Sequence, residues 1–278
     1  MNLHTIKILI GKEILDSLRN RWFYAFLAVF IALSFSIIYL GIFNSTTMGF
    51  ESFNKTTASL LNLVLLLIPM ITLLLGGTSI SSERELGTMD LMLSKPISAL
   101  ELILGKYLGI AAALIVTIVV GFGLMGMVVA FNVSAVDAQA YLIFVGLTIL
   151  LALAFLSISL LVSVLVKKRI TALIVSAIVW VFFILVYDLL VMAAANLFSG
   201  TSMAVFLVST ILLNPADAVR ILAIVSLGGE TIFGPSLIEL TRMITNVSSE
   251  LLMLAGIVFW IIAPLVLSVF FFKRSVHK

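Results

Sequence analysis

The chain of 278 residues has no cysteine and only two histidines. Without cysteine it has no disulfide, no thiolate metal site and no cysteine nucleophile. His4 and His277 lie near the two ends of the sequence, which excludes a His-based catalytic triad or a His-rich metal site in its interior. We therefore expect no enzyme, and no catalytic, cofactor-binding or metal-binding residue in this chain.

A phosphate-binding loop is also missing, because no Gly-x-x-x-x-Gly-Lys-Ser/Thr motif occurs. The chain therefore has no nucleotide site of this kind of its own. If ATP drives its activity, the ATP is bound by another subunit. We expect no nucleic acid among its partners.

Charge is scarce and apolar residues dominate. Charged residues make up 10% of the chain and hydrophobic residues 63%, against about 25% and about 45–50% in soluble domains. A soluble fold of this length cannot cover so much apolar surface, whereas lipid is itself an apolar solvent. The sequence therefore predicts an all-α integral membrane protein, with a single membrane domain over residues 1–278.

Six continuous apolar runs reach the roughly 20 residues that a helix needs to cross the hydrocarbon core. Since the runs do not alternate in polarity, they indicate helices and not barrel strands. The run that begins at Trp22 is too long for a signal-peptide core, so we interpret it as a retained span. The predicted spans are residues 22–43, 58–80, 107–131, 140–166, 170–192 and 251–272.

The 16 lysines and arginines are unevenly distributed around these six spans. Thirteen fall before span one, between spans two and three, between spans four and five, or after span six, which is one side of the membrane. Only Lys55, Arg220 and Arg242 fall on the other side. Because cytoplasmic loops are rich in Lys and Arg, both termini are predicted to be cytoplasmic, in the inner (cytoplasmic) membrane of the cell.

Residues 1–21 are predicted to form an amphipathic helix in the cytoplasmic interface. A plain basic anchor before span one is the alternative. One face of the helix is apolar and consists of Leu3, Ile6, Ile10, Ile14 and Leu18. The other faces carry Lys7, Lys12, Glu13, Asp16 and Arg19.

The cytoplasmic segment 81–106 is predicted to contain a short docking helix. Ser81 or Ser82 would cap it, and Pro96 would stop it. A second short helix over 98–105 would start at a Ser98 cap and lead into span three. The apolar face of the docking helix would consist of Leu86, Met89, Met92 and Leu93. An ordinary solvated loop is the alternative.

The outer segment 193–250 is too apolar for a disordered connection. Its runs 203–213 and 219–227 are too short to span, which indicates re-entrant or interfacial helices. Asn214-Pro215 is a turn signal, and Asp217 would lie in the first turn of the helix that follows. Further turns are predicted at 228–229 and 234–235, and another short helix at 236–244.

Polar or helix-breaking residues also occur within the predicted spans. Pro69 and Pro264 are expected to kink spans two and six. Asp188, near the outer end of span five, is the only acid in a predicted span. It is a candidate for a substrate path or for an interfacial role. Close helix contacts in span three are expected at Gly121, Gly123 and Gly126.

The docking segment resembles the corresponding segment of ABC exporter permeases, the membrane subunits of drug, polysaccharide and heme-type efflux systems. That family pattern is an acidic cluster, Gly-Thr, a leucine-rich turn, a proline and Leu-Gly-Lys at the start of span three. The residues that carry the resemblance are Glu83, Glu85, Gly87, Thr88, Leu91, Pro96, Leu100, Leu104, Gly105 and Lys106. The six-span plan extends the resemblance over the whole chain.

This resemblance implies two permease copies working with two separate ATPase subunits. It also implies that residues 83–95 form the coupling helix that docks on the ATPase. The residues implied for this contact are Glu83, Arg84, Glu85, Gly87, Thr88, Met89, Leu91, Met92 and Pro96.

Within the family, three stretches resemble the permeases of nitrous-oxide-reductase maturation systems. They are residues 12–22, the Gly87-Thr88-Met89 stretch, and Leu213-Asn214-Pro215-Ala216-Asp217 before Arg220. This finer resemblance implies a periplasmic partner on the outer segment, and a role in supplying copper or sulfur for cofactor assembly. Outer-partner or gate residues would be Asn214, Pro215, Asp217 and Arg220.

An ATPase-independent channel or secondary carrier is the alternative function. The near absence of acids within the spans argues against an ion-driven carrier. An intramembrane enzyme would need paired acids, His or Ser arranged at mid-bilayer, and these spans offer no such arrangement.

Overall fold

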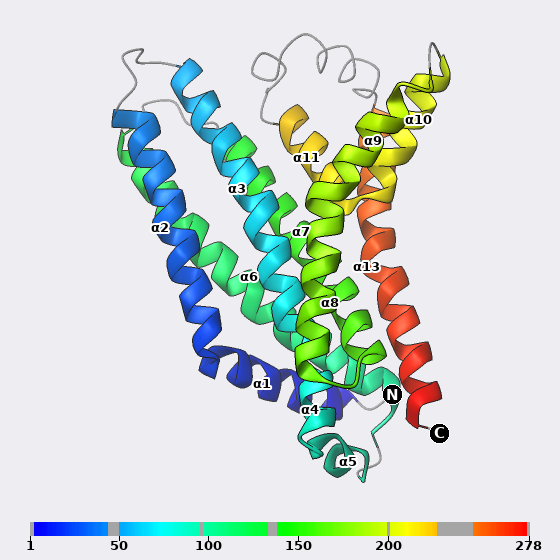
Figure 1. Ribbon diagram of the computed structural model, residues 1–278. Helices are drawn as coiled ribbons and strands as arrows, with labels where there is room; N and C mark the ends of the chain where they lie inside the picture. The colour runs from blue at the N-terminus through cyan, green and yellow to red at the C-terminus, as the bar shows by residue number, and fades with distance from the viewer. Residues whose placement is uncertain are drawn as a thin grey trace.

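The computed structural model describes residues 3–43, 50–94, 97–132, 138–198, 201–226 and 247–276. All regular elements in these ranges are helices, which confirms the predicted helical class. The long helices α2, α3, α6, α7 and α13, and the continuous helical segment of α8, η1 and α9, form a bundle in Figure 1. The two chain ends lie at the same end of the molecule, beside α1.

The long helices overlap the predicted spans closely. They are α2 (Arg21–Phe43), α3 (Phe50–Gly77), α6 (Ala99–Asn132), α7 (Ala138–Leu165) and α13 (Val247–Val276). The fifth predicted span consists of α8 (Arg169–Val181), the π-helix η1 (Phe182–Val186) and α9 (Tyr187–Ala195). The remaining helices are α1 (Leu3–Arg19), α4 (Ser81–Glu85), α5 (Thr88–Leu93), α10 (Thr201–Leu213) and α11 (Pro215–Ser226).

Five of the described helical segments are long and apolar enough to cross a bilayer. They are Ser59–Glu85, Ala99–Leu124, Tyr141–Leu165, Arg169–Ala195 and Glu250–Ser275. A sixth is reached if the bent pair α10 and α11 counts as one span. The sequence instead counts α2 as a span, the first of its six, and that assignment stays a prediction. The chain is thus a multi-pass membrane protein.

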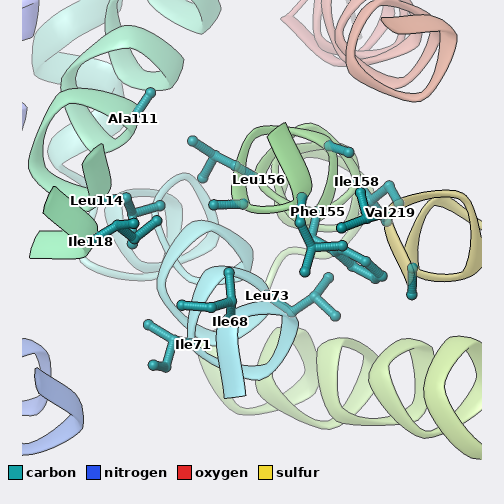
Figure 2. Close-up of a cluster of buried hydrophobic side chains, with 14 of the residues drawn as sticks. Ile68, Ile71, Leu73, Ala111, Leu114, Ile118, Phe155, Leu156, Ile158 and Val219 are labelled. Carbon is teal, nitrogen blue, oxygen red and sulfur yellow. The ribbon is translucent and has the colours of Figure 1, made fainter. Parts of the chain in front are cut away.

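The core of the bundle lies around α3 and α7. In the spans of α3 and α7, 67% of an apolar stretch of 18 residues is buried. The corresponding share is 17% for Arg169–Ala195 and 22% for Glu250–Ser275. Figure 2 shows Ile68, Ile71 and Leu73 of α3 grouped with side chains of α6 and α7, and Val219 of α11 lies beside α7. The two peripheral spans present large apolar side chains outward, as a lipid-facing or subunit-facing surface requires.

The N-terminal helix α1 crosses the ends of the spans instead of running beside them (Figure 1). Its buried face differs from the predicted apolar one. Ile6 and Leu9 are buried, but so is Glu13, at 5% exposure. Ile10 and Ile14 are only half-buried. The face that contacts α6 therefore includes a charged residue that the apolar periodicity assigned to another face.

The outer elements α10 and α11 meet at a bend of 113°. In Figure 1 the pair enters the bundle from the end opposite α5 and returns to that end, as a re-entrant hairpin does. The bend falls at Asn214-Pro215, and Asp217 lies in the first turn of α11, as the sequence predicts. The turns and helix predicted within 227–246 lie outside the described residues.

Candidate functional site

The α4–α5 segment begins where α3 passes between α7 and α8. A Cβ on Gly76 would lie 1.8 Å from Ser159 Oγ, and one on Gly77 would lie 2.1 Å from Ser176 Oγ. Only glycine allows this close approach. Beyond it, the backbone N–H groups of Ile80 and Ser81 donate to Ser163 Oγ, at 2.8 and 3.0 Å. A hydroxyl from α7 thus satisfies donors at the start of α4.

The start and the shape of the docking helix differ from the prediction. The residue that precedes α4 is Ile80, without a side-chain cap, so neither Ser81 nor Ser82 plays that role. The chain then turns at Gly87, which has φ 71° and separates α4 from α5. A positive φ favours glycine because it has no Cβ. The segment is therefore two short helices joined at Gly87, whereas the sequence predicts one.

Glu83 does not point to solvent but joins a buried ion-pair cluster. Its Oε1 lies 2.6 Å from Lys12 Nζ of α1 and 3.0 Å from Lys106 Nζ of α6. Lys106 Nζ also lies 2.8 Å from Glu13 Oε1 of α1 and donates to the Ser79 carbonyl at 3.3 Å. We call Lys12, Glu13, Glu83 and Lys106 the Lys106 cluster. It connects α1, α4 and α6.

Lys12 forms the solvent-facing side of this cluster. Burial disfavours the charged amine, but the hydrogen bond to Glu83 and the charges of Glu13, Glu83 and Asp16 outweigh it and raise the pKa of Lys12. Lys12 therefore stays charged above neutral pH. Its contact with Asp16 is longer, at 3.6 Å, and Asp16 is 55% exposed.

Arg84 and Glu85 attach α4 to three further helices. The Arg84 guanidinium donates to the Val164 carbonyl of α7 at 2.7 Å and lies 5.4 Å from the ring centre of Phe272 in α13. Glu85 accepts the backbone N–H of Arg169 at 2.6 Å, which places a carboxylate at the positive end of α8. Together with the contacts of Glu83, these contacts hold α4 against the bundle.

The turn that follows α4 and the helix α5 each present an apolar side chain outward. Leu86 is 75% exposed and Leu91 is 71% exposed, while Met89 is buried at 4%. Gly87 and Thr88 are exposed beside them. The predicted contact residues therefore divide into anchors that face the bundle and a free apolar tip. Pro96 and the side chain of Met92 lie outside the described residues.

Two glycines of α6 make room for α1. A Cβ on Gly105 would lie 2.6 Å from Leu9 Cβ, and one on Gly109 would lie 2.4 Å from Glu13 Cβ. These positions are four residues apart in both helices, so the two contact lines match. Of the glycines predicted for close contact, Gly121 and Gly126 approach Phe30 and Tyr141, but a Cβ on Gly123 would meet nothing within 4 Å.

Lys12, Glu13 and Lys106 were missed as site residues by the sequence analysis. Hydrophobic periodicity assigned Glu13 to a face other than the apolar one. Lys106 was used as a cytoplasmic charge and as part of the family resemblance, but no contact or role was predicted for it. The available signal was the pair Gly105 and Gly109, which frames Lys106 at the start of a span. In the same region, Ser98 and Glu101 form a capping box: Ser98 Oγ accepts from the Glu101 N–H at 3.3 Å, and Glu101 Oε2 accepts from the Ser98 N–H at 3.0 Å. The predicted Ser98 cap therefore starts α6 itself.

At the outer end, Asn214 ties the α10–α11 bend to the π-helix. Its Nδ2 donates to the Phe183 carbonyl of η1 and to Asp217 Oδ2, both at 2.9 Å, and its Oδ1 accepts from the Ala216 N–H at 3.0 Å. A π-helix leaves a backbone carbonyl available to such a donor. Asn214 is fully buried, so these bonds satisfy its amide inside the bundle.

Arg220 of α11 lies between two acids. It donates to Asp188 Oδ2 of α9 at 3.0 Å, and it lies 2.8 Å from Asp217 Oδ1 as an ion pair without hydrogen-bond geometry. Asp188 is thus paired within the chain. Pro215 is buried at the start of α11. The predicted roles of these residues as an outer-partner surface, gate or substrate path stay predictions.

No group of three or more His, Asp and Glu side chains suited to a metal ion occurs among the residues that the structure describes. Residues 8–275 match the family described as ABC-2 family transporter protein. The chain is 34% identical to a protein of Stutzerimonas stutzeri named probable ABC transporter permease protein NosY, over 76% of this chain and 78% of that protein. The like-named protein of Pseudomonas aeruginosa matches to the same extent.

Proposed function

Because the chain belongs to the ABC-2 family of transporter proteins, we propose that it is the membrane subunit of an ATP-driven exporter, whose α4–α5 segment docks on a separate ATPase. The observation that carries this proposal is the apolar tip formed by Leu86 and Leu91. The α4–α5 segment that carries these two exposed residues lies at the end of the molecule where α1 and both chain ends lie (Figure 1). Exposed apolar side chains outside the lipid zone are typical of a protein–protein contact.

The anchors behind the tip support the same proposal. Force transmission needs a segment that does not yield when it is pushed. Glu83, Arg84 and Glu85 fix α4 to α1, α6, α7 and α8 by short polar contacts, and the Arg84 guanidinium also faces the Phe272 ring of α13. A push on the tip would therefore reach most of the bundle.

We propose that two copies of the chain work with two ATPase subunits in the inner membrane, with both termini cytoplasmic. The uneven distribution of Lys and Arg supports this orientation, and so does the position of both chain ends beside α1 (Figure 1). The weakly buried spans Arg169–Ala195 and Glu250–Ser275 offer apolar surface to the second copy or to lipid.

For the cargo, we propose a role in copper or sulfur supply for nitrous oxide reductase. The resemblance of residues 12–22, 87–89 and 213–217 to permeases of nitrous-oxide-reductase maturation systems supports this role, together with the similarity to the two proteins named NosY. A periplasmic partner would then bind the outer segment 193–250, where α10 and α11 form the re-entrant hairpin. Asn214, Pro215, Asp217 and Arg220 hold the shape of that hairpin, and Asp188 holds it against α9.

The ATPase contact is tested with Leu86→Ser and Leu91→Ser, which remove apolar area from the tip and leave the anchors in place. The tagged chain is purified in mild detergent, and the co-purifying ABC ATPase is quantified by mass spectrometry. We expect the double variant to lose the ATPase. The control is Leu197→Ser, the same change at an 82% exposed leucine at the other end of the molecule, which is expected to retain it.

Two results would contradict the proposal. Retention of the ATPase by the Leu86→Ser/Leu91→Ser variant would show that the tip is not the docking surface. Transport by the purified chain in liposomes without any ATPase would instead favour the channel or secondary carrier.

A further inference from the structure

The Lys106 cluster is more deeply buried than a helix–helix contact at a membrane surface needs. The side chains of Lys106, Glu13 and Glu83 are 1%, 7% and 13% exposed. One ammonium group is shared by two carboxylates from different helices, and Lys12 contacts both of them, at 3.4 and 2.6 Å. Two lysines and two acids leave no net charge in the cluster.

Separating any one of these helices from the others would leave a charge unpaired in a region of low dielectric. Such a loss costs far more than the loss of an exposed pair. The elements can therefore move together more easily than they can move apart. Backbone packing adds to this, because Gly105 and Gly109 allow α1 to lie directly on α6.

We propose that the Lys106 cluster joins α1, α4 and α6 into one moving unit, so that the ATPase, by pushing on α4, also moves the interfacial helix α1. Glu13 and Lys106 are then positioning residues for coupling. This inference rests on the proposed function, because it needs the ATPase to act on α4.

The unit gives the ATPase a route from α4 to α2 through α1. Helix α1 ends at Arg19 and α2 starts at Arg21, after a single intervening residue. Because α1 lies across the bundle and α2 runs along it (Figure 1), a tilt of α1 is passed to α2. A push on α4 would thus reach α2 through α1. It would also reach α3 and α6, which adjoin α4 directly.

The test measures whether α1 stays on α6 while the ATPase works. The chain has no cysteine, so Leu9→Cys introduces a single thiol into the buried α1–α6 contact. A second reporter is Ile6→Cys, on the same buried face. The rate of maleimide labelling is measured for the permease alone, for its complex with the ATPase, and for the complex trapped with ATP and vanadate.

Glu13→Gln and Asp16→Asn are compared in this background. Both convert an acid of α1 into its amide and both acids contact Lys12, but only Glu13 contacts Lys106. With native charges or with Asp16→Asn, we expect slow labelling that nucleotide trapping leaves unchanged. With Glu13→Gln, we expect labelling to become several-fold faster and to rise further on trapping. Lys106→Met, similar in size to lysine, serves as a second variant if Glu13→Gln yields no folded protein.

Two results would overturn the inference. One is a several-fold rise on trapping in the chain with native charges, because α1 then separates from α6 in the normal cycle. The other is equal labelling in the Glu13→Gln and Asp16→Asn variants. A parallel Leu91→Cys reporter tests the proposed function separately. If the ATPase does not protect it, docking at the tip fails, and the labelling of Leu9→Cys in the permease alone still decides whether the cluster holds α1 on α6.

Discussion

At the residue scale, burial decides which of the charges near α4 matter for stability. Lys106 and Lys12 both contact Glu13 and Glu83, but Lys106 is 1% exposed and Lys12 is 36% exposed. Removing one partner from a buried charge group leaves the others uncompensated, whereas water can replace an exposed partner. The two lysines thus form a natural comparison within a single cluster.

We expect Lys106→Ala to lower the free energy of unfolding by about 3–5 kcal/mol, because Glu13 and Glu83 lose their buried partner. Lys12→Ala is expected to lower it by roughly 1 kcal/mol, because water reaches that site. Tryptophan fluorescence during heating in detergent measures both. Equal melting temperatures for the two variants would show that Lys106 is not the centre of the cluster.

A second residue-scale prediction concerns Gly109. A Cβ there would lie 2.4 Å from Glu13 Cβ and 3.1 Å from the Ile10 carbonyl, so Gly109→Ala should displace α1 and lower the melting temperature. The same change at Gly123, where a Cβ meets nothing within 4 Å, should leave stability unchanged or raise it by up to about 1 kcal/mol. A tolerated Gly109→Ala variant would contradict the close contact between α1 and α6.

At the element scale, the sequence predicted the helices well and their polar contacts poorly. Apolar run length is a local property, so α3, α6, α7 and α13 appear at their predicted positions. The buried side of α1 depends on a partner more than 90 residues away, since Glu13 pairs with Lys106. The break between α4 and α5 at Gly87 could not be inferred either. It depends on the contacts that fix α4 against distant helices, and the local sequence does not show these contacts.

The same distinction applies to the outer hairpin. The turn at Asn214-Pro215 and the start of α11 follow from local signals, but the π-helix that accepts the Asn214 amide has no sequence marker. Three bonds of one buried side chain join η1, α10 and α11. The hairpin should therefore depend on Asn214 more than on any exposed polar residue nearby.

We expect Asn214→Ala to destabilise the chain by about 1–3 kcal/mol, because the Phe183 carbonyl and Asp217 lose a buried donor. The control is Asn196→Ala, at an exposed asparagine whose Nδ2 makes one long bond of 3.5 Å to the Met192 carbonyl. Its melting temperature should match that of the unmodified chain. A similar loss in both variants would show that the hairpin is not held by Asn214.

At the scale of the whole molecule, the two ends of the bundle differ in their ion pairs and in their exposed apolar side chains. The α5 end holds the Lys106 cluster, the apolar tip and both chain ends (Figure 1). The opposite end holds the re-entrant hairpin and the Arg220 ion pairs. The proposed exporter, powered by a cytoplasmic ATPase, would use this asymmetry, because force would enter at one end and cargo would leave at the other.

This arrangement predicts opposite accessibility for two exposed positions. Lys167→Cys, between α7 and α8, should react with an impermeant maleimide only in inverted vesicles, because the distribution of Lys and Arg predicts that its side of the bundle faces the cytoplasm. Leu197→Cys, after α9, should react with the same maleimide in cells whose outer membrane has been permeabilised and whose inner membrane is intact. Since the native chain has no thiol, each label reports one site. Labelling of Lys167→Cys from outside would reverse the orientation, and the apolar tip would then face away from any cytoplasmic ATPase.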